Sequence, residues 1–300
     1  MAGAGVTDFA WRRAGCLLIA AGGVLLGCAG STADDGVPAT TTGEPTTTTT
    51  ATSSPRSAAT ALQWTPALED LGLKDPAETL WRTVYATSFE EDADLAGFYI
   101  TPQSRLTQHA VIAGATHRMG QRAHRGWLTG ESGAEPVDGP NHRGYPTIQL
   151  HRRSAGACGS PCLVDFWALL DDTPIGAGEW ISLATFASDD SDAWARVVTV
   201  NVGSEGWLHL FHVPKQGIAD RAFQATSAFP RGQWVRVTTL LDLDANGGAA
   251  AVWQDGVLMS AARVEGGDGD LDQLHLGLYA APSLTDASVW NDDVEVLTER

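Results

Sequence analysis

Apolar and polar residues alternate along most of the chain beyond about residue 140. In each run, side chains two positions apart are both apolar or both polar. This period of two residues is typical of a β-strand with one buried face. Clusters of turn-forming residues, such as 188–191 and 245–248, separate the runs. The predicted strands are 145–151, 163–169, 180–187, 197–203, 207–213, 234–243, 251–254, 274–279 and 288–297. Strands at this spacing, without long helical patterns, predict an all-β fold in which two antiparallel sheets pack as a jelly-roll sandwich.

The segment before these strands has a different pattern. Between residues 61 and 84, Leu68, Leu71 and Leu73, and then residues 77–81, fall at partly helical spacing. We therefore expect one or two short helices there. Residues 61–300 are taken as one jelly-roll domain, with 61–84 as its short helical lead-in.

The first 28 residues have the pattern of an export signal. Arg12 and Arg13 precede an apolar stretch, 14–26, as long as a signal-peptide core, and the sequence Leu-Leu-Gly-Cys then ends at Cys28. This ending resembles the bacterial lipobox, which implies removal of residues 1–27 and a lipid on Cys28. Ordinary secretory cleavage nearby is the alternative. We expect a lipid-anchored protein of the bacterial cell envelope, exported to the outer face of a membrane and attached to it only through the lipid.

Residues 28–60 are predicted to be a disordered linker. They consist almost wholly of Thr, Ser, Ala, Gly, Pro and Asp, with an unbroken run of Thr at 46–50. Such a segment cannot bury enough apolar surface to offset the entropy lost on ordering. It is expected to act as a flexible spacer.

Charge and cysteine content narrow the class of partner. The formal net charge is −17 and the pI is about 4.7. This charge repels phosphate backbones and argues against nucleic acid as a partner. Cys158 and Cys162, in the sequence Cys-Gly-Ser-Pro-Cys, are the only cysteines after the signal. Outside the cytoplasm we expect them to form a disulfide, because that environment is oxidising. A metal site is the alternative, but it would need two more ligands at finger-like spacing, and the sequence has none.

Several short motifs appear in an informative order. They are Ser-Phe-Glu-Glu-Asp at 88–92, Gly-Gln-Trp-Val-Arg-Val at 232–237, Val-Trp-Gln-Asp-Gly at 252–256, Leu-Gly-Leu-Tyr at 276–279 and Asn-Asp-Asp-Val-Glu-Val at 291–296. Over about residues 86–298 the chain resembles the concanavalin A-like lectin/glucanase superfamily, and within it the jelly-roll polysaccharide lyases. The jelly-roll glucanases carry Glu-x-Asp-x-x-Glu on one strand, and no such string occurs here. We therefore expect a lyase rather than a glycoside hydrolase.

Basic residues gather in one stretch of this acidic chain. Residues 105–153 hold seven Arg against three acidic residues, and five of the eight His. A cationic, His-rich surface suits an anionic ligand such as a uronate polysaccharide. The alternative is that these Arg form salt bridges with the acidic remainder.

The predicted strand 145–151 lies in this stretch and offers candidate catalytic groups. Alternation places Tyr145, Thr147, Gln149 and His151 on one face, which we expect to be open, while Ile148 and Leu150 enter the core. A lyase needs a group that neutralises the uronate carboxylate, and a Tyr or His that moves the proton. Gln149 with Arg143 or Arg152 could neutralise; His142, His151 or Tyr145 could act as base or acid. Arg125, Thr147 and Trp167 are expected to extend this surface for substrate binding. An inert polar face is the alternative.

The same resemblance implies a structural Ca²⁺ at one corner. The first and last strands of that superfamily often pair, which would bring Glu90 near Asp292 and Asp293. Carboxylate oxygens suit Ca²⁺, although an acidic corner without an ion fits equally well. No cofactor is required for the expected chemistry. The leading hypothesis is an envelope lipoprotein that binds, and cleaves by β-elimination, an acidic polysaccharide; a non-catalytic lectin-like protein and a structural envelope protein are the alternatives.

Overall fold

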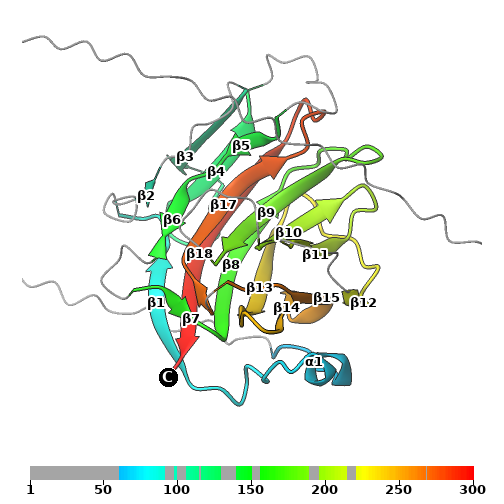
Figure 1. Ribbon diagram of the computed structural model, residues 1–300. Coiled ribbons are helices and arrows are strands. Elements are labelled where there is room, and N and C mark those ends of the chain that lie inside the picture. Colours follow the sequence, from blue (N-terminus) through cyan, green and yellow to red (C-terminus); the bar gives the residue numbers. More distant parts are fainter. Residues whose placement is uncertain are drawn as a thin grey trace, which may run out of the picture. The chain divides into compact units, whose positions relative to one another are not determined.

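The computed structural model describes residues 61–91, 98–99, 106–114, 116–129, 140–150, 156–188, 196–214, 221–267 and 269–300. In these ranges the chain is almost entirely β, with one short helix, α1 (Pro66–Asp70), beside two curved layers of strands (Figure 1). No helix in the described ranges is long and apolar enough to cross a membrane. The anchor predicted at Cys28 and the linker 28–60 lie outside the described residues.

One layer is a nine-stranded antiparallel sheet. Its order is β12-β15-β14-β13-β8-β18-β4-β3, and β1 also pairs with β18. The strands are β1 (Trp81–Thr87), β3 (Thr107–Ala113), β4 (Arg122–Leu128), β8 (Cys162–Leu170), β12 (Arg221–Gln224), β13 (Trp234–Asp242), β14 (Gly248–Gln254), β15 (Val257–Val264) and β18 (Ser288–Glu299).

The other layer is a seven-stranded antiparallel sheet. Its order is β11-β10-β9-β17-β6-β2, and β5 also pairs with β17. The strands are β2 (Phe98–Tyr99), β5 (His142–Gly144), β6 (Thr147–Gln149), β9 (Trp180–Ala187), β10 (Val197–Gly203), β11 (Leu208–Val213) and β17 (Gln273–Ala280). A short pair, β7 (Cys158–Gly159) with β16 (Asp270–Leu271), stands apart. The predicted two-sheet sandwich is confirmed.

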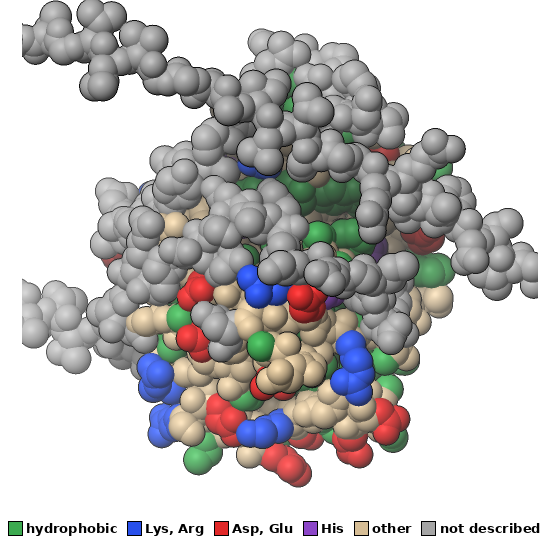
Figure 2. Space-filling model, viewed as in Figure 1, with side chains coloured by type: hydrophobic (Ala, Val, Ile, Leu, Met, Phe, Trp, Pro, Cys, Tyr) green, Lys and Arg blue, Asp and Glu red, His purple; other side chains and the backbone are tan. Residues whose placement is uncertain are grey.

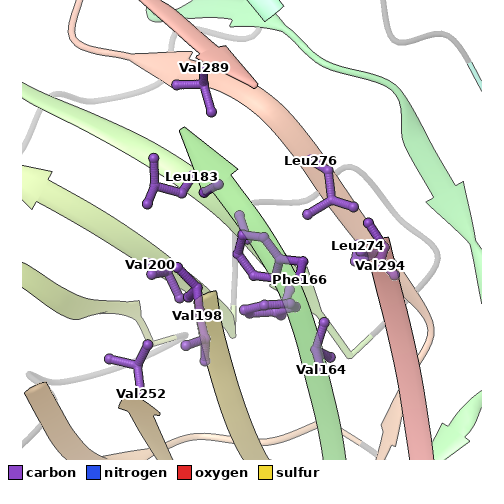
Figure 3. Close-up of a cluster of buried hydrophobic side chains, with 14 of the residues drawn as sticks. Val164, Phe166, Leu183, Val198, Val200, Val252, Leu274, Leu276, Val289 and Val294 are labelled. Carbon is purple, nitrogen blue, oxygen red and sulfur yellow. The ribbon is translucent and has the colours of Figure 1, made fainter. Parts of the chain in front are cut away.

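The core lies between the sheets. Phe166 of β8 points across to side chains such as Leu183 of β9 and Val198 of β10, and all three are fully buried (Figure 3). Every second residue of these strands enters this layer, which is why the sequence alternates with period two. Burying side chains of this size contributes roughly 1.5–3 kcal/mol each. This apolar layer is the main stabilising feature of the sandwich.

Three glycines let the two sheets touch at one place. A Cβ on Gly126 of β4 would lie 2.1 Å from the carbonyl oxygen of Gly144 in β5 and 2.5 Å from the backbone nitrogen of Leu278 in β17. Gly277 has φ +127° and would meet the same Gly144 oxygen at 2.7 Å. Both neighbours are backbone, which cannot move aside as a side chain can. Glycine is therefore required where β4 approaches the opposite sheet.

The lead-in covers part of the outer side of the nine-stranded sheet. Leu68, Leu71 and Leu73 pack on side chains of that sheet, among them Leu240. The indole of Trp253 donates a hydrogen bond to the backbone oxygen of Gln63, 2.8 Å away. The second helix expected near 77–81 is wrong, because Trp81 already pairs with the last strand as the start of β1.

The predicted disulfide is confirmed. Cys158 and Cys162 are bonded, with their Cα atoms 6.0 Å apart. The bond closes the short loop between β7 and β8.

Candidate functional site

The side of the seven-stranded sheet that faces away from the core is polar. Ile148, Leu274 and Leu276 belong to the core, so their neighbours in β6 and β17 point the other way. Residues paired directly across antiparallel strands share a face, which extends this surface over β5, β9 and β10. We call it the outer polar face; its members are Arg143, Tyr145, Thr147, Gln149, Ser182, Thr185, Thr199, Asn201, Gln273, His275 and Tyr279.

A cluster of rings lies within this face. Tyr145 stacks on His275, with ring centroids 4.6 Å apart and an interplanar angle of 12°. It meets Tyr279 edge-on at 5.9 Å, and Trp180 lies 4.9 Å from Tyr279 on another side. The amide of Asn141 donates a hydrogen bond to the Tyr279 hydroxyl at 2.6 Å. The phenol and the imidazole are thus held against one common ring, Tyr145.

Burial sets the protonation of both groups. It lowers the pKa of His275 to about 3, and the positive charge of Arg143 lowers it further in the same direction. Burial raises the pKa of Tyr279, while the bond from Asn141 and the charge of Arg143 act against that rise. At neutral pH His275 is therefore a neutral imidazole, and Tyr279 is a protonated phenol that can donate a proton.

The expected open face is buried in the structure. Gln149 is 8% exposed, His275 6% and Tyr279 9%, while Tyr145 and Thr147 are more enclosed still. Gln149 nevertheless lies on the side away from the core, as alternation predicted, because Ile148 enters the core. Arg143 retains partial exposure. His151 and Arg152, predicted for the same surface, lie outside the described residues.

His142 does not belong to this face. Alternation along β5 turns it inward, opposite to Arg143, and it is 1% exposed. Its Nε2 lies 3.1 Å from the carbonyl oxygen of Pro282 and 3.0 Å from that of Leu284. The prediction that His142 acts as acid or base is therefore corrected: its Nε2 contacts backbone carbonyl oxygens in the interior and does not face the outer polar face.

Arg125 and Trp167 do not share a surface with Gln149, and that expectation is wrong. They belong to β4 and β8 of the nine-stranded sheet, whereas Gln149 belongs to the opposite sheet. Arg125 pairs with Trp290, and Trp167 pairs with Asp292 and Arg236, all on the side away from the core. The sandwich core separates the two groups.

The three carboxylates predicted to bind Ca²⁺ meet around one loop. β1 pairs with β18, and Glu90 follows β1, so Glu90 is brought to the loop before β4 that Asp292 and Asp293 also reach. Glu90 Oε1 accepts hydrogen bonds from the backbone nitrogens of Gln121 at 3.0 Å and Arg122 at 2.9 Å.

Asp292 and Asp293 are engaged in the same way. Asp292 Oδ2 accepts from the backbone nitrogens of Arg118 at 2.9 Å and Met119 at 3.3 Å. The Arg118 guanidinium pairs with Asp293 Oδ2 at 3.0 Å. Within the described ranges, no three His, Cys, Asp or Glu side chains gather as metal ligands would. In the described residues these carboxylates fix the loop on the sheet, and the structural Ca²⁺ stays a prediction.

Sequence reasoning missed part of the outer polar face. Gln273, His275 and Tyr279 alternate with Leu274, Leu276 and Leu278 along β17, and this alternation was visible in the sequence. The sequence predicts the strand 274–279, but it assigns no residue of this strand to the candidate site. Strand pairing places Tyr279 beside Arg143, His275 beside Thr147 and Gln273 beside Gln149.

Figure 2 shows the described part of one face of the molecule. Basic and acidic side chains lie interspersed there among neutral ones. Three ion pairs join described residues: Lys74–Glu299, Arg118–Asp293 and Arg236–Asp165. Of these, Arg118–Asp293 alone involves the cationic stretch 105–153, so one of its arginines is balanced by a carboxylate in the way that the salt-bridge alternative states.

Comparisons with known proteins find likeness of structure alone. The chain matches no protein-family model, and no curated protein matches it in sequence. The cellulose-induced protein Cip1 superposes with a TM-score of 0.47 and 12% identity, over 71% of this chain and 96% of its own. Alginate lyase AlgAT5 of polysaccharide lyase family 7 superposes with a TM-score of 0.41 and 12% identity, over 74% of this chain and 95% of its own. Alginate lyase vAL-1 from Chlorella virus superposes with a TM-score of 0.43 and 8% identity, over 64% of this chain and 89% of its own.

Proposed function

We propose that the outer polar face binds an acidic polysaccharide and cleaves it by β-elimination. The observation that carries the proposal is the ring cluster of Tyr145, His275 and Tyr279 beside Arg143 and Gln149. A cation, an amide, a neutral imidazole and a protonated phenol are the groups that this reaction requires.

Each group has a role in the proposed reaction. Arg143 and Gln149 hold the uronate carboxylate and neutralise its charge, which makes the neighbouring C–H acidic. His275 takes that proton, and the C–H electron pair forms a carbon–carbon double bond. The bond to the glycosidic oxygen breaks, and Tyr279 gives its proton to the leaving oxygen. Transfer of the proton from His275 back to Tyr279 restores the starting state.

The test is turnover of acidic and neutral polysaccharides by the full chain. Alginate and glucuronan are compared with a neutral glucan, and the product is followed by the ultraviolet absorbance of its unsaturated uronate. Tyr279→Phe should lower the rate by about 10²-fold or more, since it removes the proton donor while keeping the ring. Tyr85→Phe, at a buried tyrosine of the nine-stranded sheet, is the control and should leave the rate unchanged. Absence of unsaturated product from every uronate polymer would rule out the lyase.

A non-catalytic carbohydrate-binding protein is the second candidate. The low exposure of His275 and Tyr279 favours it, because it leaves a substrate little access to these two groups. Arg143 is partly exposed and could hold a uronate carboxylate without any bond being cleaved. Binding of uronate polymers that is lost in Arg143→Gln, with no product formed, would identify this function.

Attachment to the cell envelope through a lipid on Cys28 is part of the proposal. Its support is the sequence Leu-Leu-Gly-Cys after an apolar stretch. Cys28→Ser should release the protein from the membrane fraction or block processing of the signal. An unchanged membrane fraction for this variant would refute the anchor.

A further inference from the structure

Arg125 stands on the opposite side of the molecule from the outer polar face, on the nine-stranded sheet. Along β4, Leu128 enters the core, so Arg125 and Trp127 share the side that faces away from it. Trp290 of β18 pairs directly with Arg125 and lies on that same side. A guanidinium and two indoles are therefore neighbours at the surface of the sheet.

The two indoles hold the guanidinium. Arg125 Cζ lies 5.0 Å from the ring centroid of Trp127 and 5.0 Å from that of Trp290. Its Nε donates a hydrogen bond to the Ser288 hydroxyl at 2.8 Å. Cation–π attraction and this bond fix the side chain before any ligand arrives, which lowers the entropic cost of binding. Within the part of the chain that the structure describes, no acceptor engages the two terminal nitrogens, which remain as donors.

Arg125 differs in its charge balance from Arg118 and Arg236 of the same surface. Arg118 pairs with Asp293 at 3.0 Å and Arg236 pairs with Asp165 at 2.7 Å, whereas no carboxylate of the described residues pairs with Arg125. Arg125 is partly buried, so bulk water solvates it incompletely. A fixed, partly desolvated cation without a counter-ion attracts an anion, and its planar fork matches a carboxylate.

We propose that Arg125, Trp127 and Trp290 form a second binding site, which takes the carboxylate of an acidic sugar unit. The terminal nitrogens of Arg125 bind the carboxylate. Trp127 is partly exposed and offers apolar ring surface to the C–H groups of the sugar. The choice of an acidic sugar among anions rests on the function proposed above. The domain would then hold one polysaccharide chain on each of its two outer sides.

The experiment is calorimetric titration of the full chain with an alginate hexasaccharide. The Tyr279→Phe background is used so that cleavage of the ligand is slowed, and a cello-oligosaccharide of equal length is the neutral probe. Two binding events are expected for the acidic ligand. Arg125→Gln should remove one of them, weakening it about 10- to 100-fold, the usual effect of losing a charge-assisted pair of hydrogen bonds. Arg125→Lys should also weaken it, since it keeps the charge without the planar fork.

Arg236→Gln is the matched control, because Arg236 lies on the same side of the same sheet but is paired with Asp165. It should keep both binding events. Equal binding by Arg125→Gln, by Arg236→Gln and by the background protein would overturn the second site, as would equal affinity for the neutral probe.

The outcome for the outer polar face is read separately. Arg143→Gln removes the other binding event if the proposed function is correct. If Arg125→Gln loses a binding event and Arg143→Gln loses none, the result supports the second site and contradicts binding at the outer polar face. The reverse result contradicts the second site alone. Melting temperatures of the four variants identify any that fail to fold, and the Arg125→Lys variant then decides the question for Arg125.

Discussion

Acid should destabilise this protein through buried histidine, and His124 is the clearest case. It is 1% exposed, and its Nε2 lies 3.3 Å from Nδ1 of His109. Burial lowers its pKa from 6.5 to about 3, with the neighbouring His109 acting in the same direction. Below pH 6.5 the unfolded chain binds a proton at this residue and the folded chain does not. The free energy of unfolding therefore falls as the pH is lowered.

The magnitude follows from the two pKa values. Between pH 7 and pH 5, one histidine titrating at 6.5 when unfolded and near 3 when folded removes about 2 kcal/mol of stability. His124→Gln should therefore lose about 2 kcal/mol less than the unaltered protein over this range. Burial raises the pKa of Asp292 to about 6, which acts with the opposite sign. That contribution is common to both proteins and cancels in the comparison.

The assay is urea unfolding followed by tryptophan fluorescence at pH 7 and pH 5. Phe89→Leu is the matched control, since the Phe89 ring lies 5.5 Å from that of His124 and carries no titrating group. Phe89→Leu should lower stability equally at both pH values. If His124→Gln loses as much stability on acidification as the unaltered protein does, the buried neutral histidine is not the cause.

Two further substitutions test the packing of the sheets and the loop beside them. Gly126→Ala should destabilise the fold by about 1–3 kcal/mol or more in the same urea assay, because its Cβ would meet backbone atoms of the opposite sheet; no change would show that the sheets can separate there. Asp292→Asn should lower the free energy of unfolding by about 1–3 kcal/mol and speed amide exchange at Arg118 and Met119, because the backbone N–H groups of both residues donate hydrogen bonds to the Asp292 carboxylate. Unchanged exchange would show that the carboxylate does not hold the loop.

Some strands could be predicted because one of their faces is buried and the other is polar. The runs at 180–187 and 197–203 coincide with β9 and β10. The run at 257–264 was missed because β15 has apolar neighbours on both sides: Met259 lies in the core between the sheets, while Leu258 and Ala261 pack under the lead-in. Alternation disappears where both faces are covered.

β4 escaped prediction for a different reason. Its inward positions are His124 and Gly126, which fill the place where the two sheets come close, and its outward positions carry Arg125 and Trp127. The inward face therefore reads as polar and the outward face as partly aromatic, the reverse of the usual pattern. Only the packing of the opposite sheet explains these residues.

The candidate site was predictable in part for a related reason. Alternation tells which side chains of one strand share a face, so Gln149 was placed correctly relative to Ile148. It does not tell which sheet a strand joins, so Arg125 and Trp167 were assigned to the wrong surface. The members from β17 come from a strand more than 120 residues later in the chain, and only the pairing of β17 with β5 and β6 reveals them.

The glycine contact between β4, β5 and β17 has a mechanical consequence. The two sheets meet there backbone to backbone, whereas around the core cluster side chains lie between them. Side chains can change rotamer and let packed layers shift, but backbone atoms in contact cannot move aside in this way. We therefore expect the spacing between β4 and β17 to stay fixed when the rest of the sandwich fluctuates.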